Sequence, residues 1–179
     1  VIAVETLYNA KKVAHEQGRQ FQVHAANLLE TINRNLFERY GDVQAFGANR
    51  VVAQYNQWFK PGSGIVQAMN DYVRLYGMYE LTLFVDLKGN VIAVNDRDAS
   101  GKIIQSGFLY QKNFAESGWF KDALAGKSFP TSDTLTGSIV NDLHVDENVK
   151  AVYGGEGLSL GFTSLVKDGW GNVLGVWHN

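Results

Sequence analysis

The chain has 179 residues, 45% of them hydrophobic and 19% charged, which suits one packed domain or one domain with an attached helical element. Its formal net charge of −2 argues against a nucleic-acid-binding surface, and the absence of cysteine excludes disulfides, thiolate zinc sites and cysteine nucleophiles. The sequence contains no apolar run of about 18 residues, so we expect no membrane-spanning segment within it, and no signal peptide is recognisable.

The first forty residues carry one continuous helical pattern. Apolar residues recur first at seven-residue and then at four-residue intervals, at Leu7, Ala14, Phe21, Leu28, Ile32, Leu36 and Tyr40. A helix of about 40 residues is roughly 60 Å long, whereas a domain of this size is only about 30 to 40 Å across. We therefore expect part of the helix to pack on another subunit or to lead away from the domain. Because the chain begins without methionine, directly in this pattern, we expect it to be a piece of a longer polypeptide.

Two shorter helices are predicted next, over Val43–Phe59 and from Ile65 to about Met78, separated by the helix-breaking sequence "KPGSG". From Glu80 the pattern changes to strands, because "ELTLFVD" and "NVIAVND" flank a turn at Gly89–Asn90. These changes of period predict that residues 1–79 are helical and that the sheet lies within residues 80–179.

The segment 97–156 is irregular and contains at least one strand. Within it, "SGWFKDALAGK" predicts a short helix with Ser117 as its N-cap and Gly126 as its end. The chain closes with two apolar strands, in "GLSLGFTSLVKD" and "GNVLGVWHN". A strand that is apolar at nearly every position is covered on both faces, and the available covers are the long helix and the irregular middle. The predicted fold is therefore α+β, with one antiparallel sheet of about five strands.

Two stretches that are far apart in the chain have similar sequences. "DLKGNVIAVN" (Asp86–Asn95) and "DGWGNVLGVWH" (Asp168–His178) both read Asp, two residues, Gly-Asn-Val and then an apolar strand. Both predict a tight turn followed by a buried strand. We expect their strands to meet in the middle of one sheet rather than to mark a duplication.

In this order, the helix, the hairpins and the Trp-containing helix resemble a Cache domain. Cache domains are PAS-like extracellular sensor modules of bacterial methyl-accepting chemotaxis receptors and sensor kinases. The resemblance covers almost the whole chain and rests on "NLFERYGDVQAF" (Asn35–Phe46), "LFVDLKGNVIAVND" (Leu83–Asp96), "SGWFKDALAGKSF" (Ser117–Phe129), "TSD" (Thr131–Asp133) and "GFTSLVKDGWGNVLGVW" (Gly161–Trp177). One PAS-like sheet suffices for the length, so the resemblance is to the single-module kind.

The resemblance implies a binding role with no catalysis and no cofactor. A ligand would lie between the sheet and the irregular middle and change the packing or dimer state of the long helix, so that a signal crosses the membrane. The implied partners are a short carboxylate such as acetate, a second copy of the chain through the N-terminal helix, and a membrane through segments outside this sequence. The implied location is the periplasmic side of the bacterial inner membrane.

The candidate ligand-binding residues are Tyr110, Lys112, Trp119, Phe120, Thr131, Asp133, Phe162, Ser164 and His178. Tandem members of the family that bind amino acids place an arginine two positions before the tryptophan, and this chain has Ser117 there. The resemblance therefore does not favour an amino acid. Asp133 matches an acidic position of the family, but a carboxylate suits an anionic ligand poorly. We expect Asp133 to bond backbone amides or to shape its loop.

Several of these residues have a structural interpretation as well. Trp119 and Phe120 are equally core aromatics, and Lys112 fits a solvated surface. Thr163 and Ser164 face opposite sides of one strand, so one of them must face the ligand. His178 alternates with Leu174 and Val176, and a lone histidine on such an apolar face is more often a satisfied core residue than a ligand.

Neither a metal site nor a catalytic site is predicted. His15 and His24 are nine residues apart, which does not place them together on a helix, and the acidic stretch around His144 ("NDLHVDEN") lacks the EF-hand spacing and is expected to be a solvated loop. The hydrolase, zinc-protease and phosphate-loop motifs are absent. Two alternatives to a chemoreceptor domain stay open: the sensor domain of a histidine kinase, and a cytosolic PAS-type module that binds haem or flavin or only dimerises.

Overall fold

The computed structural model describes residues 2–128 and 137–179, with the backbone alone for residues 2–10. Contacts divide the chain into an N-terminal unit, residues 1–38, and a C-terminal unit, residues 39–179. The N-terminal unit is helical and belongs to α1 (Ile2–Gly47). Side chains 11–35 are exposed, including Phe21 at 74% and Leu28 at 51%. The single long helix expected from the sequence is confirmed.

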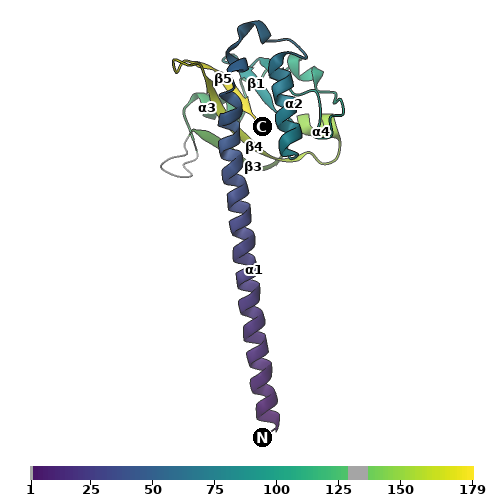
Figure 1. The fold of residues 1–179 in the computed structure, drawn as a ribbon, viewed down its shortest axis with the longest axis vertical. Helices are drawn as coiled ribbons and strands as arrows, with labels where there is room; N and C mark the ends of the chain where they lie inside the picture. Colours follow the sequence, from purple (N-terminus) through teal and green to yellow (C-terminus); the bar gives the residue numbers. More distant parts are fainter. Residues whose placement is uncertain (1, 129–136) are drawn as a thin grey trace. The chain divides into compact units, whose positions relative to one another are not determined.

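The C-terminal unit is built on a five-stranded antiparallel sheet (Figure 1). Its strands are β1 (Leu83–Asp86), β2 (Val91–Val94), β3 (Ser138–Val145), β4 (Leu158–Lys167) and β5 (Val173–His178). Their spatial order is β2-β1-β5-β4-β3, so the strands of the first and last hairpins pair at the centre. The other elements are α2 (Gly64–Tyr76), α3 (Gly118–Leu124), α4 (Glu147–Tyr153) and the 3-10 helices η1 (Arg50–Ala53), η2 (Tyr55–Gln57) and η3 (Gly107–Gln111). The expected fold class is confirmed.

The helix predicted over Val43–Phe59 is wrong. Instead, α1 continues to Gly47, whose missing side chain allows close packing, since a Cβ there would lie 3.1 Å from Val166 Cγ2. The chain then turns at Asn49, whose side chain accepts a hydrogen bond from the Val51 amide and starts η1. The apolar residues of this segment thus serve two short turns rather than one helix. The next helix, α2, is confirmed, with Ser63 as its N-cap.

The solvated loop expected around His144 is also wrong. Residues up to Val145 extend β3, and Asp146 then caps α4 by accepting hydrogen bonds from the amides of Asn148 and Val149. This acidic side chain is therefore used for helix capping.

One face of the sheet is covered by helices. Phe46 of α1 stacks on Tyr72 of α2 at 4.0 Å and meets the edge of Trp177 of β5, so both helices lie against this face (Figure 1). Two buried serines also bind the backbone of α1: Ser138 Oγ donates to the Tyr40 carbonyl at 2.7 Å and Ser164 Oγ to the Val43 carbonyl at 3.1 Å. Strands β3 and β4 are therefore hydrogen-bonded directly to the last turns of α1.

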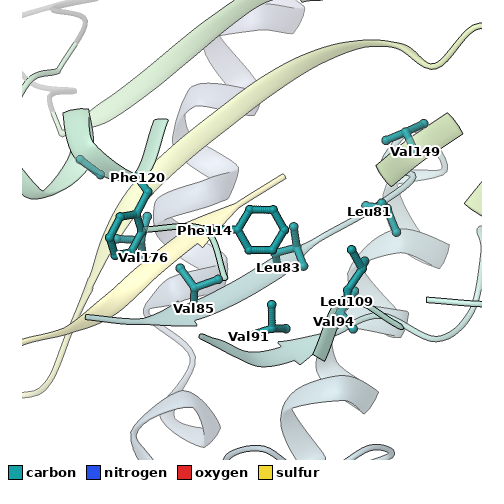
Figure 2. Packing of buried hydrophobic residues seen from close by; sticks show 11 residues of the cluster. Leu81, Leu83, Val85, Val91, Val94, Leu109, Phe114, Phe120, Val149 and Val176 are labelled. Carbon is teal, nitrogen blue, oxygen red and sulfur yellow. The ribbon is translucent and has the colours of Figure 1, made fainter. Parts of the chain in front are cut away.

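The opposite face is covered by the irregular middle of the chain. Figure 2 shows its packed cluster, in which Leu83, Val85 and Val176 of the sheet meet Phe114 and Phe120. The elements expected as covers, here the last turns of α1 and the middle segment, thus take opposite faces, as the apolar strands required.

Candidate functional site

A tryptophan and a histidine stack on the face of the sheet that the middle segment covers. Trp119, in the first turn of α3, lies parallel to His178 at the end of β5, with ring centroids 4.3 Å apart and an angle of 10° between the planes. Phe120, the next residue, is buried in the cluster of Figure 2 and fixes α3 against the sheet. The strand end and the short helix therefore hold the two rings in place from opposite sides.

His178 is buried and hydrogen-bonded on one nitrogen only. Its Nδ1 lies 2.7 Å from the hydroxyl of Thr163, which is buried directly opposite on β4. Its Nε2 has no hydrogen bond to any residue in the described ranges. Burial lowers the pKa of His178 to about 4, with Asp146 opposing the shift and His144 adding to it. The imidazole is therefore neutral near pH 7, with Nε2 able to bond a ligand.

Two further residues of β3 and β4 complete the polar surroundings. Gly161 leaves room beside the imidazole, because a Cβ at that position would lie 2.9 Å from His178 Cε1. Opposite it, the side-chain oxygen of Asn141 is buried and accepts no hydrogen bond from the described residues. A buried amide oxygen without a donor is unfavourable unless a ligand or water supplies one. We call Trp119, Asn141, Thr163 and His178 the sheet-face site.

The structure does not bring all the sequence-predicted residues to this site. Phe162 and Ser164 alternate with Thr163 along β4, so they lie on the helix-covered face, where Ser164 binds α1. Lys112 is exposed, donates to the Asn148 side chain at 2.6 Å and lies over the Phe108 ring. Tyr110 lines a separate cavity beside β2. Thr131 and Asp133 lie outside the described residues.

Trp119, Phe120 and His178 are the predicted residues that do lie together. Asn141 and Gly161 were not predicted, and Thr163 was considered only as the alternative to Ser164. The sequence offers a signal for Thr163, a polar residue in an apolar strand, but the same signal marks Ser164. Only the pairing of Thr163 with His178 decides which of the two faces the site.

Comparisons with known proteins give no match by sequence and clear matches by structure. No protein-family profile matches the chain. No curated sequence is significantly similar to it. The ligand-binding domain of the amino acid chemoreceptor PctC of Pseudomonas aeruginosa PAO1, in complex with GABA, matches with a TM-score of 0.55 and 17% identity, over 83% of this chain and 54% of that one. The sensor domain of the Vibrio cholerae histidine kinase DctB matches with a TM-score of 0.52 and 15% identity, over 94% and 55%.

The ligand-binding domain of the Pseudomonas fluorescens chemoreceptor CtaA, in complex with L-leucine, matches with a TM-score of 0.50 and 14% identity, over 83% and 50% of the two chains. The chain has the Cache sensor-domain fold. The resemblance drawn from the sequence is thereby confirmed for the fold, and the chain spans about half the length of the sensor domains that it matches.

Two further features, metal-binding clusters and membrane-spanning helices, are absent from the parts of the chain that the structure describes. The described residues hold no group of three or more histidine or acidic side chains placed to bind a metal ion. No helix in the described part of the chain is both long and apolar enough to cross a membrane. The sheet-face site itself offers a neutral imidazole, a hydroxyl and an amide beside an aromatic wall, a set suited to binding a small polar molecule.

Proposed function

We propose that this chain is the extracytoplasmic sensory domain of a bacterial transmembrane chemoreceptor and that it binds a small organic ligand at the sheet-face site. The observation that carries the proposal is the stack of the half-buried Trp119 on the buried His178, whose Nε2 has no hydrogen bond to the described residues. The fold adds support, because the matched structures are sensory domains rather than enzymes. The proposal therefore includes ligand binding without catalysis. A histidine kinase sensor of the same fold is the second candidate, supported by the match to DctB.

The ligand that we propose is a short-chain carboxylate such as acetate. Nε2 of His178 and the side-chain amide of Asn141 can donate hydrogen bonds to carboxylate oxygens, while the Thr163 hydroxyl donates to Nδ1 of His178 and so keeps the proton on Nε2. GABA and L-leucine, bound in the PctC and CtaA structures, share a carboxylate group. Ser117, the N-cap residue of α3, stands two positions before Trp119 and leaves no arginine there to hold a larger amino acid. The donors of this site are uncharged, so they cannot neutralise a fully buried carboxylate. They therefore favour a small ligand whose carboxylate stays partly in contact with water.

The adjacent residues Thr163 and Ser164 supply a route from ligand to helix. Thr163 bonds His178 on the site face, whereas Ser164 bonds the Val43 carbonyl of α1 on the other face. A shift of β4 on ligand binding would therefore move the last turns of α1. We propose that this movement is the output signal.

Binding can be tested by isothermal titration with a panel of C2–C4 carboxylates, using protein refolded to remove any ligand carried through purification. Thr163→Val removes the hydroxyl that orients His178 and should weaken acetate binding about tenfold or more. The matched variant Ser164→Ala removes a hydroxyl from the neighbouring position on the other face and should bind acetate within about twofold of wild type. Failure of the whole panel would remove the carboxylate proposal, and equal effects of the two variants would move the site. A coloured, cofactor-loaded protein would instead support the cytosolic PAS alternative.

We further propose that two copies associate through the seven-spaced face of the N-terminal unit. Phe21 and Leu28 belong to that face and are exposed in the single chain. Phe21→Asp should weaken the dimer at least about tenfold in sedimentation equilibrium, because a buried charge opposes association. Gln22→Asp adds the same charge to the outer side of the helix and should leave the dimer intact. Equal dimerisation of both folded variants would refute the interface.

A further inference from the structure

A cavity lies on a different part of the C-terminal unit from the sheet-face site, beside the outer strand β2. Its volume is about 510 Å³, which is within the usual range for small-molecule pockets, about 300 to 1,000 Å³. Three segments line it: the turn and helix start at 59–66, strand β2 with Asp96 two residues beyond it, and the stretch 103–111. None of the four residues of the sheet-face site lines it. We call this cavity the edge pocket.

The walls of the edge pocket are mainly apolar and partly uncovered. Val66, Val91 and Val94 form its buried side, whereas Phe59 and Ile103 stand at its rim and are 50% and 62% exposed. An apolar ligand body would cover the two exposed side chains and remove their surface from water. The apolar walls thus favour binding of an apolar group, but they do not distinguish one polar or charged ligand group from another.

Two polar groups of the lining, the Tyr110 hydroxyl and the Asp96 carboxylate, can distinguish between ligands by their polar group. The hydroxyl of Tyr110 is buried and has no hydrogen bond of standard geometry within the described residues, although the Val94 backbone is close by. Burial raises the pKa of Tyr110, the Val94 backbone opposes this, and the negative charge of Asp96 adds to it. The half-buried Asp96 accepts a hydrogen bond from the Asn70 side chain on Oδ1 alone, at 2.7 Å. Its other oxygen is therefore available to a ligand near Tyr110.

The charge of the lining is one-sided. Asp96 is its only charged residue among those described, so no lysine, arginine or histidine offsets the carboxylate. A bound anion would meet uncompensated repulsion, whereas an ammonium group could donate to both Asp96 and the Tyr110 oxygen. The edge pocket therefore differs in charge preference from the sheet-face site.

The backbone at the rim is held in an unusual conformation. Phe59 has φ 57°, the only positive φ of a non-glycine residue in the described ranges. Its amide donates to the Ile92 carbonyl of β2 at 3.0 Å, which holds its ring at the pocket. Such conformations are uncommon for a bulky residue and occur often at binding sites.

We propose that the edge pocket is a second ligand site, for a small primary amine whose apolar body lies against Phe59 and Ile103 and whose ammonium group binds Asp96 and Tyr110. This site is independent of the proposed carboxylate site, and its occupancy can be tested separately.

The test is isothermal titration of the whole chain with three probes of nearly equal shape: 2-phenylethylamine, 2-phenylethanol and phenylacetate. The amine should bind at least about tenfold more tightly than the neutral and anionic probes. Asp96→Asn keeps the oxygen that accepts from Asn70 and should weaken amine binding about tenfold or more, and Tyr110→Phe should weaken it about threefold or more. His178→Gln, at the sheet-face site, should leave amine binding unchanged.

Folding of each variant is checked by thermal unfolding, and Ile103→Ala serves where Asp96→Asn fails to fold. That truncation at the rim should weaken all three probes by a similar factor, because it removes only apolar contact. Equal binding of amine and alcohol, loss of amine binding in His178→Gln alone, or no binding of the amine would each overturn the proposal.

Discussion

The two hairpin turns of the sheet, Asp86–Asn90 and Asp168–Asn172, form the same hydrogen bonds in different surroundings. In each turn, one aspartate oxygen accepts from the amides two and four residues later, and the other accepts from the asparagine side chain. The repeated Asp-x-x-Gly-Asn pattern is therefore explained by the local geometry of one kind of turn. The two turns differ in whether other parts of the chain pack against them.

The first turn is packed against the middle segment, whereas the second is in solvent. The Gly89 carbonyl accepts from the Phe114 amide at 2.8 Å, and the Asn113 side chain donates to the Lys88 carbonyl at 2.8 Å. In the second turn, Trp170 is 89% exposed and no described atom lies within 4 Å of a Cβ built on Gly171. The first turn thus fixes the start of the segment that carries Trp119.

Alanine substitutions at the two glycines should separate these roles and give the largest effect. Both glycines have positive φ, near 83° and 86°, so alanine is strained at either position by about 1 to 2 kcal/mol. Only at Gly89 would the new Cβ also lie 2.3 Å from the Ala115 backbone nitrogen, which adds about 1 to 3 kcal/mol of overpacking. Gly89→Ala should therefore lower the free energy of unfolding, measured in urea, well beyond Gly171→Ala. Equal losses would show that the packed turn is no anchor.

The comparison also explains what could be predicted from the sequence. The turns, α2, the sheet and the pairing of the two hairpins could be predicted because they follow from local residue patterns and strand burial. The segment after Gly47 could not, because its apolar residues pack against distant parts of the chain, as Trp58 does against Phe84 of β1. The capping role of Asp146 was likewise hidden in an acidic stretch that suggested a loop.

The site was predictable only in part, for a related reason. Trp119 and His178 stand out as residue types in an apolar context, and they do stack. Whether Thr163 or Ser164 faces the site depends on the register between β4 and β5, where shifting the pairing by one residue exchanges the two faces. A single sequence gives no measure of that register.

The two hairpins differ again at their other ends, at Asn95 and His178. Asn95 is fully buried, and its side chain accepts from the Thr82 amide and donates to the carbonyls of Glu80 and Arg97, so its hydrogen bonds are satisfied within the chain. His178, in contrast, bonds Thr163 on one nitrogen, and its other nitrogen has no hydrogen bond within the described ranges. The first hairpin thus ends in a structural polar residue, and the second ends in the residue for which we propose ligand binding.

The pH dependence of stability should reveal this second difference, with an effect that does not exceed the upper end of the loss expected for Gly89→Ala. Burial lowers the pKa of His178 to about 4 in the folded chain, whereas an unfolded histidine titrates near pH 6.5. Between these values the unfolded chain binds the extra proton and the folded chain does not, so stability falls as the pH is lowered from about 6.5 to 4, by about 3 kcal/mol in total. Above about pH 6.5 both states are neutral, and this contribution is constant.

The carboxylates of the chain titrate in part of the same range, so the measurement is a difference between variants. Urea unfolding from pH 4.5 to 7.5 should give a flatter curve for His178→Gln, whereas His15→Gln, at an exposed position of the N-terminal unit, should follow the wild type. Saturating acetate should reduce the wild-type slope, because a carboxylate at Nε2 favours the protonated imidazole and raises the folded-state pKa of His178. A wild-type curve that coincides with that of His178→Gln would mean that His178 is not shielded from solvent. The second hairpin would then end, like the first, in a residue with only a structural role.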